Sequence, residues 1–191
     1  MSEAALVPIE TVFDGHRFRS RTEARWAVFF RHMGWKYGYE QEGFNLDGLY
    51  YLPDFWLPET GCWFEIKGVV PTDREIMLMS RLVFKSKRQG FIAIGAPQSD
   101  EHQLIWFRPS LAETWHSKFS DDWATAYVGL NCGPKQPARF KLSVSKQQNL
   151  CLFTQGFDLG FLLDSGPIET AFLEAAYFKA TGARFEYGET P

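Results

Sequence analysis

Three residues in the first half of the chain have the types and spacing that phosphodiester chemistry requires. Asp54 precedes Glu65 by eleven positions, and Lys67 follows two positions later. One or two carboxylates fixed on rigid strands can bind a hard cation such as Mg²⁺, which this hydrolysis needs. An ammonium group beside them could hold or help to deprotonate the attacking water, or stabilise charge on the phosphoryl oxygens. These three residues are therefore the candidate catalytic residues.

A hairpin would bring these side chains together. Residues 62–67 (CWFEIK) are predicted to form a strand, in which Trp63, Glu65 and Lys67 share one face and the other three residues take the opposite face. A preceding strand is expected over about residues 49–57, interrupted or bulged at its proline. A Pro-Glu-Thr-Gly turn joins the two strands. Asp54 on the first strand should therefore lie near Glu65 on the second.

Helices are expected before and after this hairpin. Ser20 and Glu23 have the spacing of a capping box, and the apolar run that follows them stops at Gly34. Thr72 is a plausible N-cap for the second helix, which has acids in its first turn and ends at Gly90. The expected order is α-β-β-β-α-β, with helix 20–33, strands 36–40, 49–57 and 62–67, helix 72–89 and strand 91–95.

The motif and the order of elements resemble a known family. Pro53-Asp54, a ten-residue spacer and Glu65-Ile66-Lys67 are similar to the signature of the PD-(D/E)XK nuclease superfamily. The resemblance implies a restriction-endonuclease-like α/β core, in which helices flank a mixed central sheet. It also implies a nuclease that depends on Mg²⁺ or Mn²⁺. The metal-binding roles of that family fall on Asp54, Glu65 and the carbonyl of Ile66, and the role toward the hydrolytic water falls on Lys67.

Glu23 is a further candidate for the catalytic site. Many members of the superfamily carry an acid on the first helix, and Glu23 stands where that acid would be. The same residue is equally well explained as the acidic half of a capping box that begins at Ser20. Both interpretations are open at the level of the sequence.

Basic residues are concentrated on both sides of the motif, although the net charge of the chain is -3. Residues 16–36 include six Lys or Arg and one acid, and residues 81–88 include four and no acid. Such clusters are often solvated helix faces, but their position beside the motif favours contact with nucleic-acid phosphates. The expected nucleic-acid-binding residues are Arg17, Arg19, Arg21, Arg25, Lys85, Lys87 and Arg88.

Other polar and aromatic side chains near the motif have an ordinary structural explanation. Glu40 and Glu42 lie in a polar loop and are expected to be solvated, although they could contribute to the site. Tyr51, Trp56 and Trp63 could stack on bases. In a chain with 17% aromatic residues, a position in the core is the better expectation for them.

The nuclease core is expected to span residues 1–108, followed by a C-terminal α+β extension at 109–191. A Gly- and Pro-rich segment at 129–137 is a candidate loop or boundary. The extension could belong to the same domain, complete the sheet, or bind a partner, including a second copy of this chain. Further elements are expected at residues 104–107 and 140–144 (strands) and 167–182 (a helix with Pro167 in its first turn).

Composition and missing motifs argue against several other classes. There is no apolar run of about 18 residues and no basic leader, so we expect a cytoplasmic protein without membrane contact. The three cysteines are far apart and are expected to be buried thiols rather than disulfides or zinc ligands. The sequence contains no phosphate-binding loop, no Gly-x-Ser-x-Gly elbow and no His-Glu-x-x-His pair.

The expected function is metal-dependent hydrolysis of phosphodiester bonds. DNA is the expected substrate, because the superfamily that the motif resembles is dominated by DNA enzymes. One alternative is a catalytically silent protein that keeps the fold and binds nucleic acid or a host protein. Another is a structure-selective repair or junction-resolving enzyme. The chain length and the motif also suggest a phage or mobile-element setting.

Overall fold

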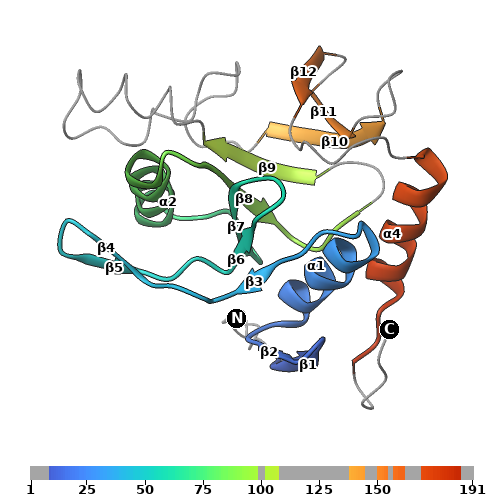
Figure 1. Ribbon diagram of the computed structural model, residues 1–191, viewed down its shortest axis with the longest axis horizontal. Coiled ribbons are helices and arrows are strands. Elements are labelled where there is room, and N and C mark those ends of the chain that lie inside the picture. Colours follow the sequence, from blue (N-terminus) through green and yellow to red (C-terminus); the bar gives the residue numbers. More distant parts are fainter. Residues whose placement is uncertain are drawn as a thin grey trace, which may run out of the picture.

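The computed structural model of the 191-residue chain is mixed α/β, with a mixed central sheet and helices against it (Figure 1). It describes residues 9–98, 102–107, 138–144, 150–154, 157–161 and 169–185. The expected loop at 129–137 and Pro167 lie outside these residues. In the part that is described, no helix is long and apolar enough to cross a membrane.

The central sheet has eight strands in the order β12-β11-β10-β9-β8-β7-β6-β3. The pair β7 and β8 is parallel, and the other neighbouring strands are antiparallel. The sheet is therefore mixed, as expected. Its strands are β3 (Gly38–Tyr39), β6 (Phe55–Leu57), β7 (Cys62–Lys67), β8 (Gln89–Ile94), β9 (His102–Phe107), β10 (Ala138–Val144), β11 (Leu150–Thr154) and β12 (Phe157–Phe161).

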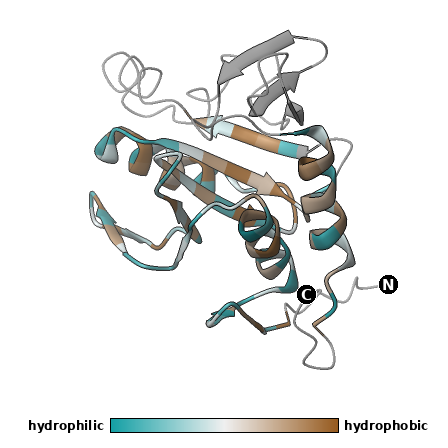
Figure 2. Cartoon of the chain, turned by 45° about the vertical axis from the view of Figure 1, so that its right-hand side comes forward, coloured by the Kyte–Doolittle hydropathy of each residue, from teal (hydrophilic) through white to brown (hydrophobic). Residues whose placement is uncertain are grey.

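Helices pack against both faces of the sheet. The helices are α1 (Arg21–His32), α2 (Asp73–Ser86) and α4 (Thr170–Gly182). Phe64 on β7 belongs to one apolar cluster with Trp26 of α1 and Tyr177 of α4, whereas its neighbour Trp63 belongs to a second cluster with Leu82 of α2. This alternation follows from the two-residue period of a strand. Figure 2 shows the apolar residues of the sheet strands between these helices.

Both helices that flank the candidate site begin as the sequence predicts. The Ser20 hydroxyl accepts a hydrogen bond from the Glu23 amide (3.2 Å) at the start of α1. Thr72 and Glu75 form a full capping box at the start of α2. The expected end of α2 is wrong, because Lys87 ends this helix in a left-handed conformation (φ 56°).

Gly90 is not the stop of α2 but a residue of β8. A Cβ atom at this position would lie 2.6 Å from the Met79 sulfur and 2.6 Å from a Val83 methyl group. The absence of a side chain therefore lets α2 approach β8 closely. The strand expected at 91–95 is accordingly longer at its start and runs over 89–94.

The single strand expected at 49–57 is two strands in two different sheets. Its first part, β5 (Leu49–Tyr51), pairs with β4 (Phe44–Leu46) in a separate hairpin, and its second part is β6. Pro53 lies between them, where a residue without an N–H group interrupts a ladder. A turn at residues 45–48 closes the β4–β5 hairpin, with the Gly48 amide bonded to the Asn45 side chain at 2.8 Å.

The remaining differences concern short strands before and after the segment that holds the motif. A hairpin of β1 (Thr11–Phe13) and β2 (His16–Phe18) precedes α1, and the strand expected at 36–40 is only the two residues of β3. Strands β11 and β12 were not expected. Helix α4 ends at Gly182, as predicted, but begins at Thr170 rather than at residue 167.

Candidate active site

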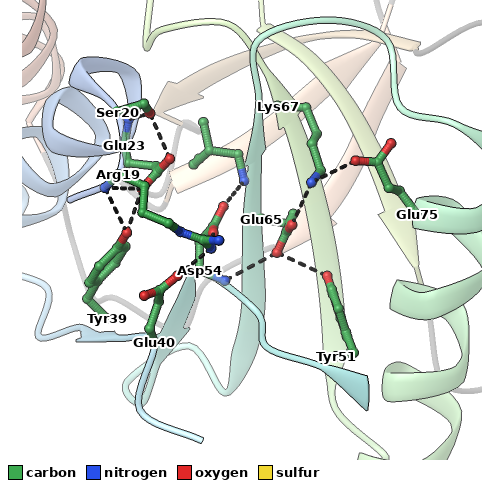
Figure 3. A network of polar contacts seen from close by, with 11 residues as sticks. Arg19, Ser20, Glu23, Tyr39, Glu40, Tyr51, Asp54, Glu65, Lys67 and Glu75 are labelled. Carbon is green, nitrogen blue, oxygen red and sulfur yellow. Dashed lines mark hydrogen bonds and ion pairs between the residues drawn. The ribbon is translucent and has the colours of Figure 1, made fainter. Parts of the chain in front are cut away.

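Asp54 and Glu65 lie opposite each other because of the register between β6 and β7. Phe55 pairs with Phe64, so one further step along the antiparallel ladder places Asp54 across from Glu65. Two reciprocal hydrogen bonds fix this arrangement. Asp54 Oδ2 accepts the Ile66 amide at 2.7 Å, and Glu65 Oε2 accepts the Asp54 amide at 3.2 Å. Figure 3 shows the two carboxylates side by side at the centre of a polar network.

Lys67 lies between two carboxylates at the end of β7. Its Nζ is 2.9 Å from Glu65 Oε1 and 2.9 Å from Glu75 Oε1. Burial by itself lowers the pKa of Lys67, but the two carboxylates more than offset this, so its pKa is raised and the ammonium stays charged at neutral pH. The sequence identified Glu75 only as a first-turn acid of α2, and its contact with Lys67 was not expected.

Tyr51 of the β4–β5 hairpin also belongs to the site. Its hydroxyl donates a hydrogen bond to Glu65 Oε2 at 3.0 Å, and the side chain is buried. Burial and the charges of Glu65 and Asp54 raise the pKa of Tyr51 well above its usual value, so the phenol remains a donor. The expectation of a core position for Tyr51 is confirmed, but its contact with Glu65 had no signal in the sequence.

Arg19 and Glu40 form the opposite side of the network. Arg19 Nη2 is 3.2 Å from Asp54 Oδ1, and the same nitrogen pairs with Glu40 Oε1 (Figure 3). The Glu40 amide donates to the Asp54 carbonyl at 2.8 Å, with Glu40 in a left-handed conformation (φ 44°). Glu40 is therefore a partner in the site rather than a solvated loop residue, whereas Glu42 is exposed as expected.

Glu23 is buried at the start of α1, and its contacts match a capping role. Oε1 accepts from the Ser20 hydroxyl at 2.7 Å, and Oε2 accepts from the Arg19 amide at 3.1 Å and the Tyr39 hydroxyl at 2.6 Å. It makes no direct bond to Asp54 among the described contacts. Its negative charge nevertheless raises the pKa of Asp54.

The site holds more negative than positive charge. Burial raises the pKa of Asp54 well above its usual range, and the nearby charges of Glu65 and Glu23 raise it further, against the opposing effects of the Ile66 amide and Lys67. Five carboxylates (Glu23, Glu40, Asp54, Glu65 and Glu75) thus surround two cationic groups (Arg19 and Lys67).

This donor set fits a hard divalent cation. Mg²⁺ needs few protein ligands, because it retains several waters and binds substrate phosphate. Asp54 and Glu65, with the Ile66 carbonyl, could supply such a partial shell, and a cation there would offset the excess negative charge. Among the described residues, no three His, Cys, Asp or Glu side chains form a ready-made metal-binding group, so any such site rests on these two carboxylates and on water.

The predicted phosphate-binding residues are not gathered in one place. Arg17 is exposed and pairs with Glu10, and Arg19 is in the site. Arg21 and Arg25 are half-buried on α1.

The second basic cluster lies at the far end of α2. Ten residues separate Lys85 from Glu75, which is about 15 Å along a helix. Lys85 is bonded to the β4–β5 hairpin through Asp47 Oδ1 (2.9 Å), and Lys87 lies over the ring of Phe84. Arg88 is exposed. Of the seven, Arg19 is placed in contact with a candidate catalytic carboxylate, that of Asp54.

The remaining sequence expectations concern aromatic residues and thiols. Trp63 is buried on the α2 side of the sheet, which confirms the core position for this residue. Trp56 is only partly buried and packs against Trp63, with their ring centres 4.5 Å apart. Cys62 is buried, as expected, and burial raises the pKa of its thiol to about 12.

Comparisons with protein-family models, with curated proteins and with solved structures found no match to this chain. The family resemblance therefore depends on the motif and on the arrangement of residues described above.

Proposed function

We propose that this chain is a metal-dependent nuclease that hydrolyses phosphodiester bonds in DNA. The observation that carries the proposal is the position of Asp54, next to β6, beside Glu65 of β7, with the ammonium of Lys67 on Glu65. The Asp54 carboxylate is fixed there by the amide of Ile66. Two buried carboxylates are costly unless a cation compensates for them. The order α1, β3, β6, β7, α2 and β8, with the β4–β5 hairpin between β3 and β6, supports the proposal, because the resemblance implies an α-β-β-β-α-β order.

In this proposal Asp54, Glu65 and the carbonyl of Ile66 hold Mg²⁺ or Mn²⁺. The ion would supply a polarised phosphoryl oxygen and a water that loses its proton more easily. The protein fixes the two carboxylates from adjacent strands, so that little reorganisation is needed at the moment of reaction. Glu23 contributes through its charge and through its bond to the main chain of Arg19.

Lys67 acts as a fixed positive charge in this scheme. Its contacts with Glu65 and Glu75 keep it protonated, so it is suited to orienting the attacking water and stabilising negative charge on the phosphoryl oxygens. It is less suited to removing a proton. The attacking water loses a proton to solvent as its oxygen bonds to phosphorus, and the leaving oxygen departs with the bonding electrons and is protonated by solvent.

A plasmid-cleavage assay with and without Mg²⁺ tests the proposal. Wild-type protein should cleave only with the metal, and Asp54→Asn and Glu65→Gln should abolish cleavage. Glu59→Gln is the matched control, because Glu59 is an exposed acid in the turn of the same hairpin. Cleavage that survives in Asp54→Asn would identify a contaminating nuclease and would count against the assignment.

The catalytically silent alternative is favoured by one observation. All four carboxylate oxygens of Asp54 and Glu65 already have protein partners: the Ile66 amide, Arg19, Lys67, and Tyr51 with the Asp54 amide. A saturated network of this kind could serve stability alone. This alternative predicts DNA or protein binding without cleavage in Mg²⁺ or Mn²⁺.

Comparison of flaps, junctions, single strands and plain duplex as substrates would separate a structure-selective enzyme from a general nuclease.

A further inference from the structure

Arg19 occupies a carboxylate oxygen that a metal ion would use. Its guanidinium contacts Asp54 Oδ1 at 3.2 Å and also pairs with Glu40. The other oxygen of Asp54 is bonded to the Ile66 amide. Arg19 is therefore the side-chain counter-ion of Asp54, whereas the Ile66 amide belongs to the main chain of β7.

The main chain of Arg19 is anchored independently of its side chain. Its amide donates to Glu23 Oε2 and to the Tyr39 hydroxyl, both at 3.1 Å. These bonds hold the residue at the start of α1. The guanidinium can leave Asp54 by rotation about side-chain bonds, with no change in the main chain.

The two cations of the site differ in how deeply they are held. The Arg19 side chain is 58% exposed, whereas that of Lys67 is 25% exposed and lies between two carboxylates. Water can therefore replace the contacts of Arg19 at low cost. Each cation contacts two carboxylates, but the side chain of Arg19 is the more exposed of the two, so Arg19 is the better candidate for exchange.

We propose that Arg19 is an exchangeable counter-ion, which neutralises Asp54 and Glu40 without metal and is displaced when a divalent cation binds. The inference rests on the proposed function. A planar guanidinium matches a phosphate as well as it matches a carboxylate. Displacement therefore releases a phosphate-binding group at the rim of the site only after the metal is in place. Metal and nucleic acid then bind in an ordered, mutually supporting way.

Titration of the full, DNA-free chain with Mn²⁺ in a calorimeter is the first test. Arg19→Met removes the competing charge and should bind Mn²⁺ about tenfold more tightly than the wild type. A merely structural role would weaken metal binding or leave it unchanged. Arg31→Met is the matched control, because Arg31 is 57% exposed and pairs with Asp14 away from the site. Its affinity for Mn²⁺ should equal that of the wild type.

Binding to a short DNA duplex is the second test, with Ca²⁺ as a non-catalytic metal. In EDTA, Arg19→Met should bind the duplex as the wild type does, because the guanidinium is held by Asp54 and Glu40. In Ca²⁺, the salt dependence of binding should be weaker for Arg19→Met, with a slope smaller by about one phosphate contact. Circular dichroism and thermal unfolding of each variant establish that it is folded.

The outcomes separate the inference from the proposed function. If the wild type binds Mn²⁺ and Arg19→Met binds it equally or more weakly, the counter-ion role is wrong and the nuclease proposal stands. If neither protein binds Mn²⁺, both are wrong. Equal salt slopes for the two proteins in Ca²⁺ would overturn the release of Arg19 to phosphate.

Discussion

The two halves of the candidate site hold their carboxylates in different ways. Glu65 and its partners Lys67 and Tyr51 are largely buried, and Lys67 is tied to Glu75 at the start of α2. Asp54 faces Arg19, which is more than half exposed and is also paired with Glu40. We call Glu65 with Lys67 and Tyr51 the rigid half of the site, because these side chains are mostly buried. Asp54 with Arg19 and Glu40 is the open half, because the Arg19 side chain is mostly exposed to solvent. This contrast is the basis of our proposal that Arg19, rather than Lys67, is the exchangeable cation of the site.

The largest expected effect comes from removing the cation of the rigid half. Lys67→Met should lower the rate of DNA cleavage by about a hundredfold to a thousandfold, the usual cost of losing a preorganised electrostatic contact. Arg19→Met should cost only about tenfold, because its group is exchangeable. Single-turnover cleavage in Mg²⁺ measures both, with the exposed Lys36→Met as control. Equal losses for Lys67 and Arg19 would remove the distinction between the two halves.

The next effect concerns the buried phenol of the rigid half. Tyr51→Phe removes a hydrogen bond to a charged, buried acceptor and should lower the free energy of unfolding by about 1–3 kcal/mol. Tyr50→Phe is the matched control, because Tyr50 is the neighbouring residue and is 71% exposed. Its effect should stay within about 0.5 kcal/mol. Urea unfolding in EDTA measures both variants, and equal stabilities would argue against a tight contact at Glu65.

The pH dependence of stability should report on the open half. The raised pKa of Asp54 means that the folded protein keeps a proton to a higher pH than the unfolded chain does. Between the unfolded and folded pKa values, stability should therefore fall as pH rises, by up to about 1.4 kcal/mol per pH unit for one proton. Urea unfolding in EDTA at a series of pH values should show this slope in the wild type and lose it in Asp54→Asn. An unchanged slope in the variant would assign the proton to another group.

The smallest effect concerns the surface tie between the β4–β5 hairpin and α2. Lys85→Met breaks a contact with Asp47, whose side chain is 58% exposed. It should cost no more than about 0.5 kcal/mol, as for other exposed ion pairs. A double-mutant cycle with Asp47→Asn measures the coupling. A coupling well above this value would show that the hairpin, and with it Tyr51, depends on this tie.

The rigid half was the part that the sequence could specify. Alternation over 62–67 places Glu65 and Lys67 on one face, and the turn that follows β6 brings Asp54 to its position, because these relations are local. Both capping residues, Ser20 and Thr72, were also found from local patterns. Local patterns thus predicted β7 and the starts of α1 and α2.

Long-range partners could not be read in the same way. Tyr51 lies in the separate β4–β5 hairpin, and the chain enters the central sheet only after Pro53. The alternation pattern alone does not indicate this change of sheet or the contact of Tyr51 with Glu65. Glu40 pairs with Arg19 and has a left-handed backbone conformation, which its local sequence does not predict. The prediction of a helix stop at Gly90 is wrong, because a glycine at a helix end and a glycine beneath a helix look alike in a sequence.

Glu75 has two tasks, and they cannot be changed separately. It closes the capping box with Thr72 and it also holds Lys67. Thr72 is exposed, and an exposed residue ordinarily tolerates substitution. A replacement that breaks its capping box with Glu75 would, however, also displace the carboxylate that holds the ammonium of Lys67. Efforts to engineer a more heat-resistant variant by redesigning helix ends should therefore leave this one untouched, because a single carboxylate both caps the helix and holds the ammonium of Lys67.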